Sequence, residues 1–343
     1  MNCEVSLSLN ILFDMTREQL KSAILNVTAT NFNELALQIF HYQYESNAVY
    51  RQFVDLLRIN PTSVHEIEKI PFLPISFFKN FEIKTGDWKA ETIFTSSGTT
   101  GQVTSQHFVR DVDLYNKITR TGFEYFYGNI EQYSVLALLP AYLERKGSSL
   151  VHMANYFISL SKEEKSDFYL YNYAALAEQL QYNQQQQIPT LLLGVSFALW
   201  DLAEQFPMNL SDIVIMETGG MKGRRKEITR TELHKIYNLS FQTKKIHSEY
   251  GMTELLSQGY SKGDGIFYAT PTMKIKIREI TDPFTMQKNG KVGGVNIIDL
   301  ANLDSCSFIA TDDLGRLYDD NSFEILGRFD NSDIRGCNLM VAN

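Results

Sequence analysis

The stretch Phe94–Gly101 carries backbone and side-chain groups that can bind a phosphate. It reads Phe-Thr-Ser-Ser-Gly-Thr-Thr-Gly, which is typical of a tight loop whose N–H groups and hydroxyls turn inward around an anion. The apolar Ile93 and Phe94 indicate the end of a strand, where α/β folds place their ligand loops. A solvated Ser/Thr/Gly linker has the same composition, so that alternative stays open on the loop alone. The candidate phosphate-binding residues are Ser96, Ser97, Gly98, Thr99, Thr100 and Gly101.

A second candidate segment, residues 247–254, combines an aromatic ring, a glycine and a carboxylate just after a predicted strand. A tyrosine beside a glycine can lay its ring on a planar base, and the glutamate that follows can hold Mg²⁺ through a carboxylate oxygen. A polar turn with a surface glutamate would have the same composition. The candidate nucleotide-binding residues here are His247, Tyr250, Gly251, Thr253 and Glu254, with Glu254 as the metal ligand.

The third candidate segment is Thr311-Asp312-Asp313-Leu314, followed by Gly327-Arg328-Phe329-Asp330. An aspartate after a strand can accept hydrogen bonds from both hydroxyls of a ribose, and an arginine can support it. We therefore take Asp313 and Arg328 as candidate ribose-binding residues. An aspartate-rich turn with an unrelated surface arginine is the alternative.

Composition narrows the class of protein that could carry these segments. The chain has 343 residues, 44% of them hydrophobic and 21% charged, so it can bury a large core. Its net charge of −8 argues against a general nucleic-acid or anionic-membrane surface. Three widely spaced cysteines fit a reduced, cytoplasmic setting better than a disulfide scaffold. We expect no signal peptide and no membrane span.

The order of predicted elements indicates an α/β fold. A capping box at Thr16–Gln19 predicts a short helix, and apolar spacing predicts a long one over residues 33–57. Strands at 134–139, 189–193, 213–216 and 245–247 alternate with helices at 111–128, 149–160, 197–206 and 227–239, which favours a largely parallel sheet. We expect an N-terminal helical segment packed on the main domain (1–90), an α/β region (91–259), a β-rich lobe (260–326) and a tail (327–343).

Taken together and in this order, the three segments resemble the adenylate-forming enzymes: acyl- and aryl-CoA ligases, peptide-synthetase adenylation domains and luciferases. FTSSGTTG is similar to their phosphate loop, YGMTE to their adenine and Mg²⁺ motif, TDDL to their ribose motif and GRFD to their hinge motif. Gly219 and Gly220 fit the turn that flanks adenine in that family. The resemblance implies their large N-terminal domain, with mixed sheets covered by helices and a smaller β-rich lobe. It also implies ATP and Mg²⁺ as cofactors.

The mobile C-terminal domain of that family, with its catalytic lysine, has no counterpart in this sequence. A one-domain adenylating chain resembles the acyl-protein synthetases of the bacterial bioluminescence fatty-acid reductase complexes. The ending Arg335-Gly336-Cys337 is similar to theirs. That resemblance implies activation of a fatty acid with ATP, transfer of the acyl group to Cys337, and delivery to a partner acyl reductase or another acceptor protein.

The cation that faces the phosphates must come from elsewhere in the chain, because no lysine follows the phosphate loop. Lys222, beside the adenine-flanking turn, is the candidate, with Arg145 or Lys146 in reserve; a solvated charge explains Lys222 equally well. Three other functions stay open. The chain could be a CoA ligase of the phenylacetate type, an adenylating loader of a carrier protein, or a nucleotide-binding subunit without activity.

Overall fold

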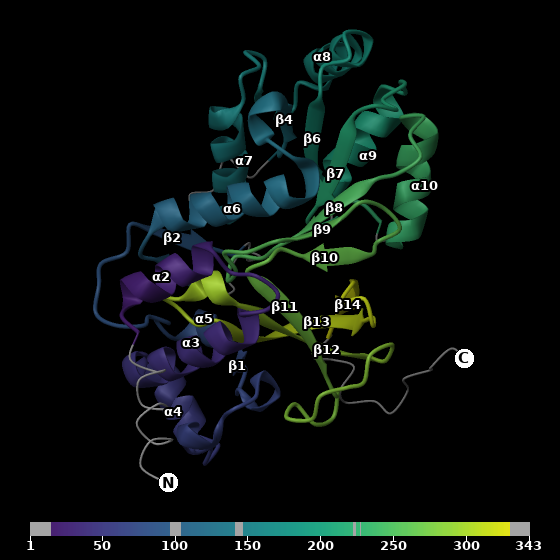
Figure 1. The fold of residues 1–343 in the computed structure, drawn as a ribbon. Helices are drawn as coiled ribbons and strands as arrows, with labels where there is room; N and C mark the ends of the chain where they lie inside the picture. The colour runs from purple at the N-terminus through teal and green to yellow at the C-terminus, as the bar shows by residue number, and fades with distance from the viewer. Residues whose placement is uncertain (1–14, 97–103, 141–146, 222–223, 227, 330–343) are drawn as a thin grey trace.

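The computed structural model describes residues 15–96, 104–140, 147–221, 224–226 and 228–329, and they fold around one large mixed sheet. That sheet has 12 strands, eleven of them in the order β11-β12-β13-β14-β10-β9-β8-β7-β6-β4-β5, and β1 pairs with β13. Strands β2 and β3 form a separate two-stranded sheet (Figure 1). The helices are α2 (Arg17–Leu25), α3 (Phe32–Ser46), α4 (Ala48–Leu56), α5 (Phe77–Asn80), α6 (Val112–Tyr127), α7 (Ser149–Leu160), α8 (Tyr173–Gln185), α9 (Ser196–Gln205) and α10 (Arg230–Ser240). The strands are β1 (Leu73–Pro74), β2 (Thr92–Thr95), β3 (Gln106–Val109), β4 (Ser134–Leu138), β5 (Asp167–Phe168), β6 (Thr190–Val195), β7 (Val214–Thr218), β8 (His247–Tyr250), β9 (Gly259–Ser261), β10 (Phe267–Ala269), β11 (Met273–Arg278), β12 (Val292–Asp299), β13 (Phe308–Leu317) and β14 (Phe323–Arg328).

The parallel half of the sheet consists of β4, β5, β6, β7 and β8. Every residue of β4 and β6 is buried, as expected for strands covered on both faces. Helices α6 and α7 lie on one side of these strands and α9 and α10 on the other (Figure 1). The predicted helices and strands between residues 111 and 250 are all present, each within three residues of its predicted bounds. Helix α8, between β5 and β6, has no counterpart in the prediction.

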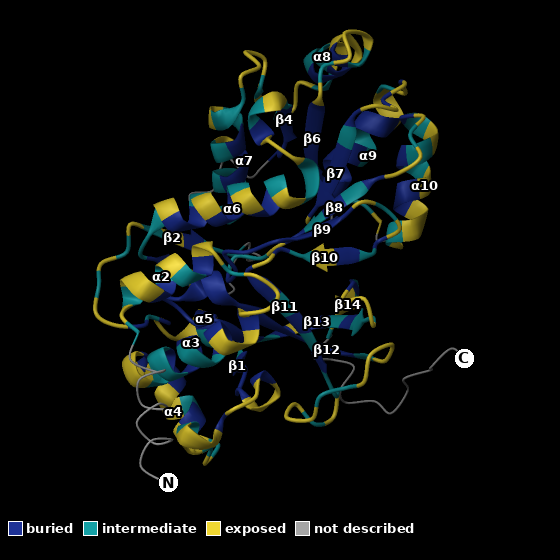
Figure 2. Cartoon of the chain, viewed as in Figure 1, coloured by how far each residue is buried: buried dark blue, intermediate teal, exposed yellow. Residues whose placement is uncertain are grey.

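The antiparallel half consists of β11 to β14, and β9 and β10 join it to the parallel half by continuous strand pairing. In β11 buried and half-buried residues alternate, which confirms the period-two pattern at Lys274–Arg278. Helices α2, α3 and α4 lie beside this half of the sheet, and their outer faces are exposed (Figures 1 and 2). The proposed boundaries at residues 90, 259 and 326 stay a prediction.

The prediction of one long helix over residues 33–57 is wrong in one respect. The structure has two helices there, α3 and α4, which meet at Asn47. The Asn47 side chain accepts a hydrogen bond from Tyr50 N–H and so caps α4. Its amide also donates to the carbonyl oxygen of Ser305, 2.9 Å away and 258 residues further along the chain. A local cap and a tertiary contact, both made by the Asn47 side chain, therefore coincide with the break between α3 and α4.

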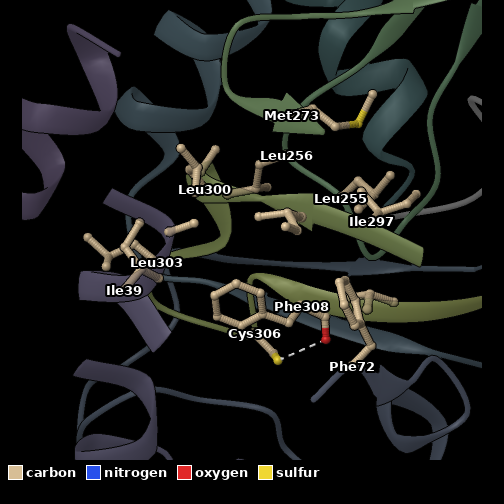
Figure 3. Close-up of a cluster of buried hydrophobic side chains, with 14 of the residues drawn as sticks. Ile39, Phe72, Leu255, Leu256, Met273, Ile297, Leu300, Leu303, Cys306 and Phe308 are labelled. Carbon is tan, nitrogen blue, oxygen red and sulfur yellow. Dashed lines mark hydrogen bonds between the residues drawn. The ribbon is translucent and has the colours of Figure 1, made fainter. Parts of the chain in front are cut away.

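The core beneath α3 and the antiparallel half packs around Phe308 (Figure 3). The Phe308 ring stacks on Tyr50 at 6.0 Å and meets Phe40 and Phe72 edge to face. Cys306 lies in the same cluster, where its thiol donates to the Phe308 carbonyl oxygen at 3.5 Å. This core fixes β13, the strand that carries Asp313, against the N-terminal helices.

The fold class predicted from the sequence is confirmed: a large mixed sheet and a small sheet, covered by helices. Within the residues that the structure describes, no helix is both long and apolar enough to cross a lipid bilayer.

Candidate active site

A cleft of about 1560 Å³ opens along the carboxyl ends of the parallel strands and is bounded on its other side by β13 and β14. This is where open α/β sheets bind their ligands. The three candidate segments meet in it, although they are far apart in the sequence. The predicted residues that line it are Ser96, Gly219, Gly220, Tyr250, Gly251, Thr253, Glu254, Asp313 and Arg328.

Asp313 lies at the centre of a three-residue cluster at the β13 side of the cleft. Its carboxylate is 5% exposed and accepts a hydrogen bond from Tyr250 Oη at 2.7 Å and one from Arg328 Nε at 3.1 Å. The pairing of β13 with β14 places Arg328 directly opposite Asp313. The Arg328 side chain is 73% exposed and also lines the cleft. The cluster therefore holds the Asp313 carboxylate in one position, where it can accept hydrogen bonds from the hydroxyl groups of a ligand.

Glu254 lies near this cluster and is 5% exposed. Burial raises the pKa of its carboxyl, and a hydrogen bond from the Ser105 side chain and the charges of Arg328 and Lys79 act in the opposite direction. Ser105 follows the predicted phosphate loop in the sequence, and its N–H donates to Oγ of Ser96, which begins that loop, at 2.9 Å. Glu254 therefore lies beside the two ends of the predicted phosphate loop.

Lys79 is a cation of this site that sequence reasoning missed. It lines the cleft from α5. The neighbouring Phe78 is buried and meets the His107 ring at 5.8 Å. His107 is neutral, because burial lowers its pKa to about 4, and its Nδ1–H donates to the Thr253 carbonyl oxygen at 2.9 Å. These contacts fix α5 against the residue that precedes Glu254, and no local pattern in the sequence could have revealed them.

The turn after β7 forms the far wall of the cleft. Gly219 has φ of +71°, a backbone conformation that favours glycine, and Gly220 faces open space. Just before this turn, the buried Glu217 accepts a hydrogen bond from Ser196 Oγ at 2.6 Å and lies 2.8 Å from His234 Nε2. This network fastens the turn to helices α9 and α10.

Glu249 is a second carboxyl of the cleft that the sequence did not single out. Thr218 Oγ1 donates to its Oε2 at 2.5 Å. The two residues follow the last paired positions of β7 and β8, Glu217 and Ser248, so they lie side by side across the parallel pair. Burial raises the pKa of Glu249 to about 7.

His247 is the one described candidate that the structure does not bring to the cleft wall. Its Nδ1 lies 3.1 Å from Tyr127 Oη, and burial lowers its pKa to about 4. The remaining candidates lie outside the described residues: Ser97, Gly98, Thr99, Thr100, Gly101, Lys222 and Cys337, with the reserve cations Arg145 and Lys146.

The oxygen ligands in the cleft suit a Mg²⁺ ion that is bound together with a nucleotide, and not a metal ion bound by protein side chains alone. Among the described residues, no group of three or more His, Cys, Asp or Glu side chains could hold a metal ion. Mg²⁺ in nucleotide sites is commonly bound through one or two carboxylates together with phosphate oxygens. Glu254, one carboxylate beside a predicted phosphate loop, matches that arrangement.

Comparisons with known proteins agree with this geometry. Residues 24–121 match the family model described as acyl-protein synthetase, LuxE. The ATP-bound structure of MatB from Rhodopseudomonas palustris is 14% identical, with a TM-score of 0.53 over 71% of this chain and 49% of MatB. An open conformation of 2-hydroxyisobutyryl-CoA ligase, in complex with 2-HIB-AMP and CoA, is 13% identical, with a TM-score of 0.64 over 93% of this chain and 72% of the ligase. No curated protein sequence matches the chain.

These matches agree with the resemblance drawn from the motifs. The match to the acyl-protein synthetase model is confined to residues 24–121, a segment that includes the predicted phosphate loop. The structural matches show the fold of the adenylate-forming enzymes. The chain spans about half the length of MatB, the first of these structures.

Proposed function

We propose that this chain, which matches the acyl-protein synthetases in sequence and the adenylate-forming enzymes in fold, activates a carboxylic acid with ATP and takes the acyl group onto Cys337. The first product is an acyl-adenylate, released together with pyrophosphate. The acyl group then passes to the thiol and from there to an acceptor protein. We take a fatty acid as the substrate class, because the motifs and the ending Arg335-Gly336-Cys337 resemble the acyl-protein synthetases of the fatty-acid reductase complexes.

The observation that carries the proposal is the convergence of Asp313, Glu254 and Ser96 on one cleft. The Asp313 carboxylate, fixed by Tyr250 and Arg328, accepts the ribose hydroxyls. Ser96 stands at the base of the loop that binds the phosphates. Glu254 lines the same cleft and interacts with Ser105 and Arg328, and its carboxylate would hold Mg²⁺ there.

The adenylation step brings two anions together, since the substrate carboxylate attacks the α-phosphorus. The site must therefore supply positive charge and hydrogen-bond donors at that point. Mg²⁺ held by Glu254 would neutralise part of the negative charge of the phosphates. The chain's own contributions are the amides and hydroxyls of the phosphate loop and the cation Lys79 beside Glu254. Lys222, the cation proposed from the sequence, stays a candidate.

In the second step a cysteine thiol attacks the mixed anhydride. Cys306 is unsuited to this role, because it is fully buried and burial raises its pKa to about 12. We assign the step to Cys337 on the strength of the family resemblance. Thiols are intrinsically strong nucleophiles, so Cys337 needs only modest activation. The acceptor of the acyl group is then a partner acyl reductase or a similar protein.

Acyl labelling tests this proposal. The chain is incubated with ATP, Mg²⁺ and a radiolabelled fatty acid, and we expect a protein-bound label that neutral hydroxylamine cleaves. Cys337→Ala should abolish the label and leave pyrophosphate exchange intact, because adenylation precedes the thiol. A hydroxylamine-labile label on the alanine variant would show that another residue accepts the acyl group. Label transfer only to added CoA would favour the CoA ligase alternative.

A further inference from the structure

The part of the cleft beside helices α6 and α7 is used by none of the nucleotide or metal assignments. Tyr115 from α6 and Ser149, Leu150 and Met153 from α7 line it, and we call it the α6–α7 pocket. The Tyr115 hydroxyl donates to the Ser149 carbonyl oxygen at 3.2 Å and so joins the two helices. The Tyr115 ring also meets the ring of Phe94 edge to face at 5.2 Å, on the strand that leads into the predicted phosphate loop. A molecule in this pocket would therefore lie next to the phosphates of a bound nucleotide.

Glu249 lies on the same side of the sheet as this pocket. Successive residues of a strand point to opposite faces. On β7, the Glu217 side chain is hydrogen-bonded to helices α9 and α10, so Thr218 faces the other side, toward α6 and α7. The Glu249 carboxylate accepts a hydrogen bond from Thr218 at 2.5 Å and interacts electrostatically with Tyr115 of α6. Glu249 therefore faces away from the contacts that fasten the adenine-flanking turn to α9 and α10.

Two acceptor oxygens at this end of the pocket have no hydrogen-bond donor within the described residues. One is Glu249 Oε1, because Thr218 bonds only to Oε2. The other is Oε1 of Gln258, a side chain that also lines the cleft and is 4% exposed. Both side chains lie beside Gly251, where an added Cβ atom would stand 2.4 Å from Glu249 Oε1 and 3.8 Å from Gln258 Cγ. Glycine at this position leaves the carboxyl its place.

The surroundings of these two oxygens are polar but supply no donor to them. The Tyr260 hydroxyl is buried, interacts electrostatically with Glu249 and has no hydrogen-bond partner of its own in the described part of the chain. Buried polar atoms in folded proteins are nearly always paired, with protein, water or a ligand. The two acceptor oxygens therefore fit a ligand that brings a hydrogen-bond donor into the pocket.

We propose that the α6–α7 pocket binds the carboxylic acid substrate, and that Glu249 and Gln258 select an acid with a hydrogen-bond donor on its chain, a hydroxyl or an amino group. This inference rests on the proposed function. Leu150 and Met153 give the hydrocarbon part of the acid an apolar wall. An unsubstituted fatty acid would cover both acceptor oxygens without pairing them, which costs free energy that the substituted acid does not lose.

Pyrophosphate exchange with matched acids tests the inference. The full chain is incubated with Mg-ATP, labelled pyrophosphate and straight-chain acids of equal length: the unsubstituted acid, its 2- and 3-hydroxy derivatives and its 2- and 3-amino derivatives. The series is repeated at several chain lengths. We expect kcat/KM for at least one substituted acid to exceed that for the unsubstituted acid about tenfold or more, because the buried acceptors then have a partner. The hydroxy and amino arms show which donor the pocket takes.

Two variants test whether Glu249 and Gln258 make the selection. Glu249→Met and Gln258→Met nearly keep side-chain length and remove the acceptor oxygens. Each should lower the preference for the substituted acid about tenfold or more. Lys235→Met, on α10 in another part of the cleft wall, is the matched control and should leave the preference unchanged. A merely structural role would slow exchange with all acids alike, so an unchanged preference in both Glu249→Met and Gln258→Met would overturn the inference.

The same measurements separate failure of this inference from failure of the proposed function. Wild-type protein that exchanges pyrophosphate with no acid would contradict the proposed function and the inference with it. Wild-type protein that uses the unsubstituted acid as well as every substituted one would contradict the inference alone, and would leave water as the partner of the two oxygens. Thermal melting of each variant shows that the protein is folded when the rates are compared.

Discussion

Arg328 stands directly opposite Asp313 in the β13–β14 pair, and its Nε donates to Asp313 Oδ1 at 3.1 Å. The other oxygen of the same carboxylate accepts from Tyr250, which comes from the parallel half of the sheet. One aspartate thus ties together the two sides of the cleft. The nucleotide assignments depend on this contact, because it brings YGMTE and TDDL into one site.

Asp313→Ala should weaken ATP binding at least tenfold, measured by calorimetry. The variant loses two charge-assisted hydrogen bonds to the ribose, each worth about 1.5–3 kcal/mol. Asp319→Asn, at an exposed position after β13 that does not line the cleft, is the matched control and should change the affinity little. Unchanged ATP affinity in a folded Asp313→Ala protein would remove Asp313 from the nucleotide site.

Glu254→Gln should lower pyrophosphate exchange at least about a hundredfold and leave the melting temperature almost unchanged. The substitution keeps the shape of a side chain that is 5% exposed, and it removes a charge that burial disfavours. A titration with Mg²⁺ checks the cause, since the residual activity should need a higher Mg²⁺ concentration. Exchange at near wild-type rate would show that Glu254 is not the metal ligand.

The sequence predicts those parts of the fold and site that depend on local pattern. The capping box at Thr16 is present, and the helix expected at residues 149–160 has those bounds. The missing parts depend on contacts between distant residues. The amide of Asn47, between α3 and α4, donates to the distant Ser305 carbonyl oxygen, and the Glu249 carboxylate accepts a hydrogen bond from Thr218 on the neighbouring strand. No local spacing encodes either contact.

Lys79→Met should raise the KM for ATP and slow pyrophosphate exchange about tenfold or more, because the phosphates lose a cation beside Glu254. Lys84→Met is a matched control on the same segment. Lys84 lies over the Trp88 ring at 5.0 Å and is not among the residues of the cleft wall. Steady-state kinetics of both variants decide the matter. Equal effects in the two would show only a loss of general surface charge.

Stability should depend on the protonation of Glu249. Burial raises its pKa in the folded protein to about 7, so between its ordinary value of about 4.5 and 7 the folded state binds more protons than the unfolded state. The contribution of this group to folding stability therefore falls as pH rises through that window. Glu249→Gln should be more stable relative to wild type at pH 8 than at pH 5. Urea denaturation at both pH values measures the difference, and a constant difference would contradict the raised pKa.

Acid-dependent exchange of labelled pyrophosphate into ATP tests the central claim most directly. The wild-type chain is incubated with Mg-ATP, labelled pyrophosphate and one acid at a time from a series of fatty and aromatic carboxylic acids. The account predicts rapid exchange with at least one acid, with fatty acids favoured, none without acid, and its loss in Asp313→Ala and Glu254→Gln. Tight ATP binding with no exchange for any acid would contradict the account and leave a nucleotide-binding subunit without ligase activity.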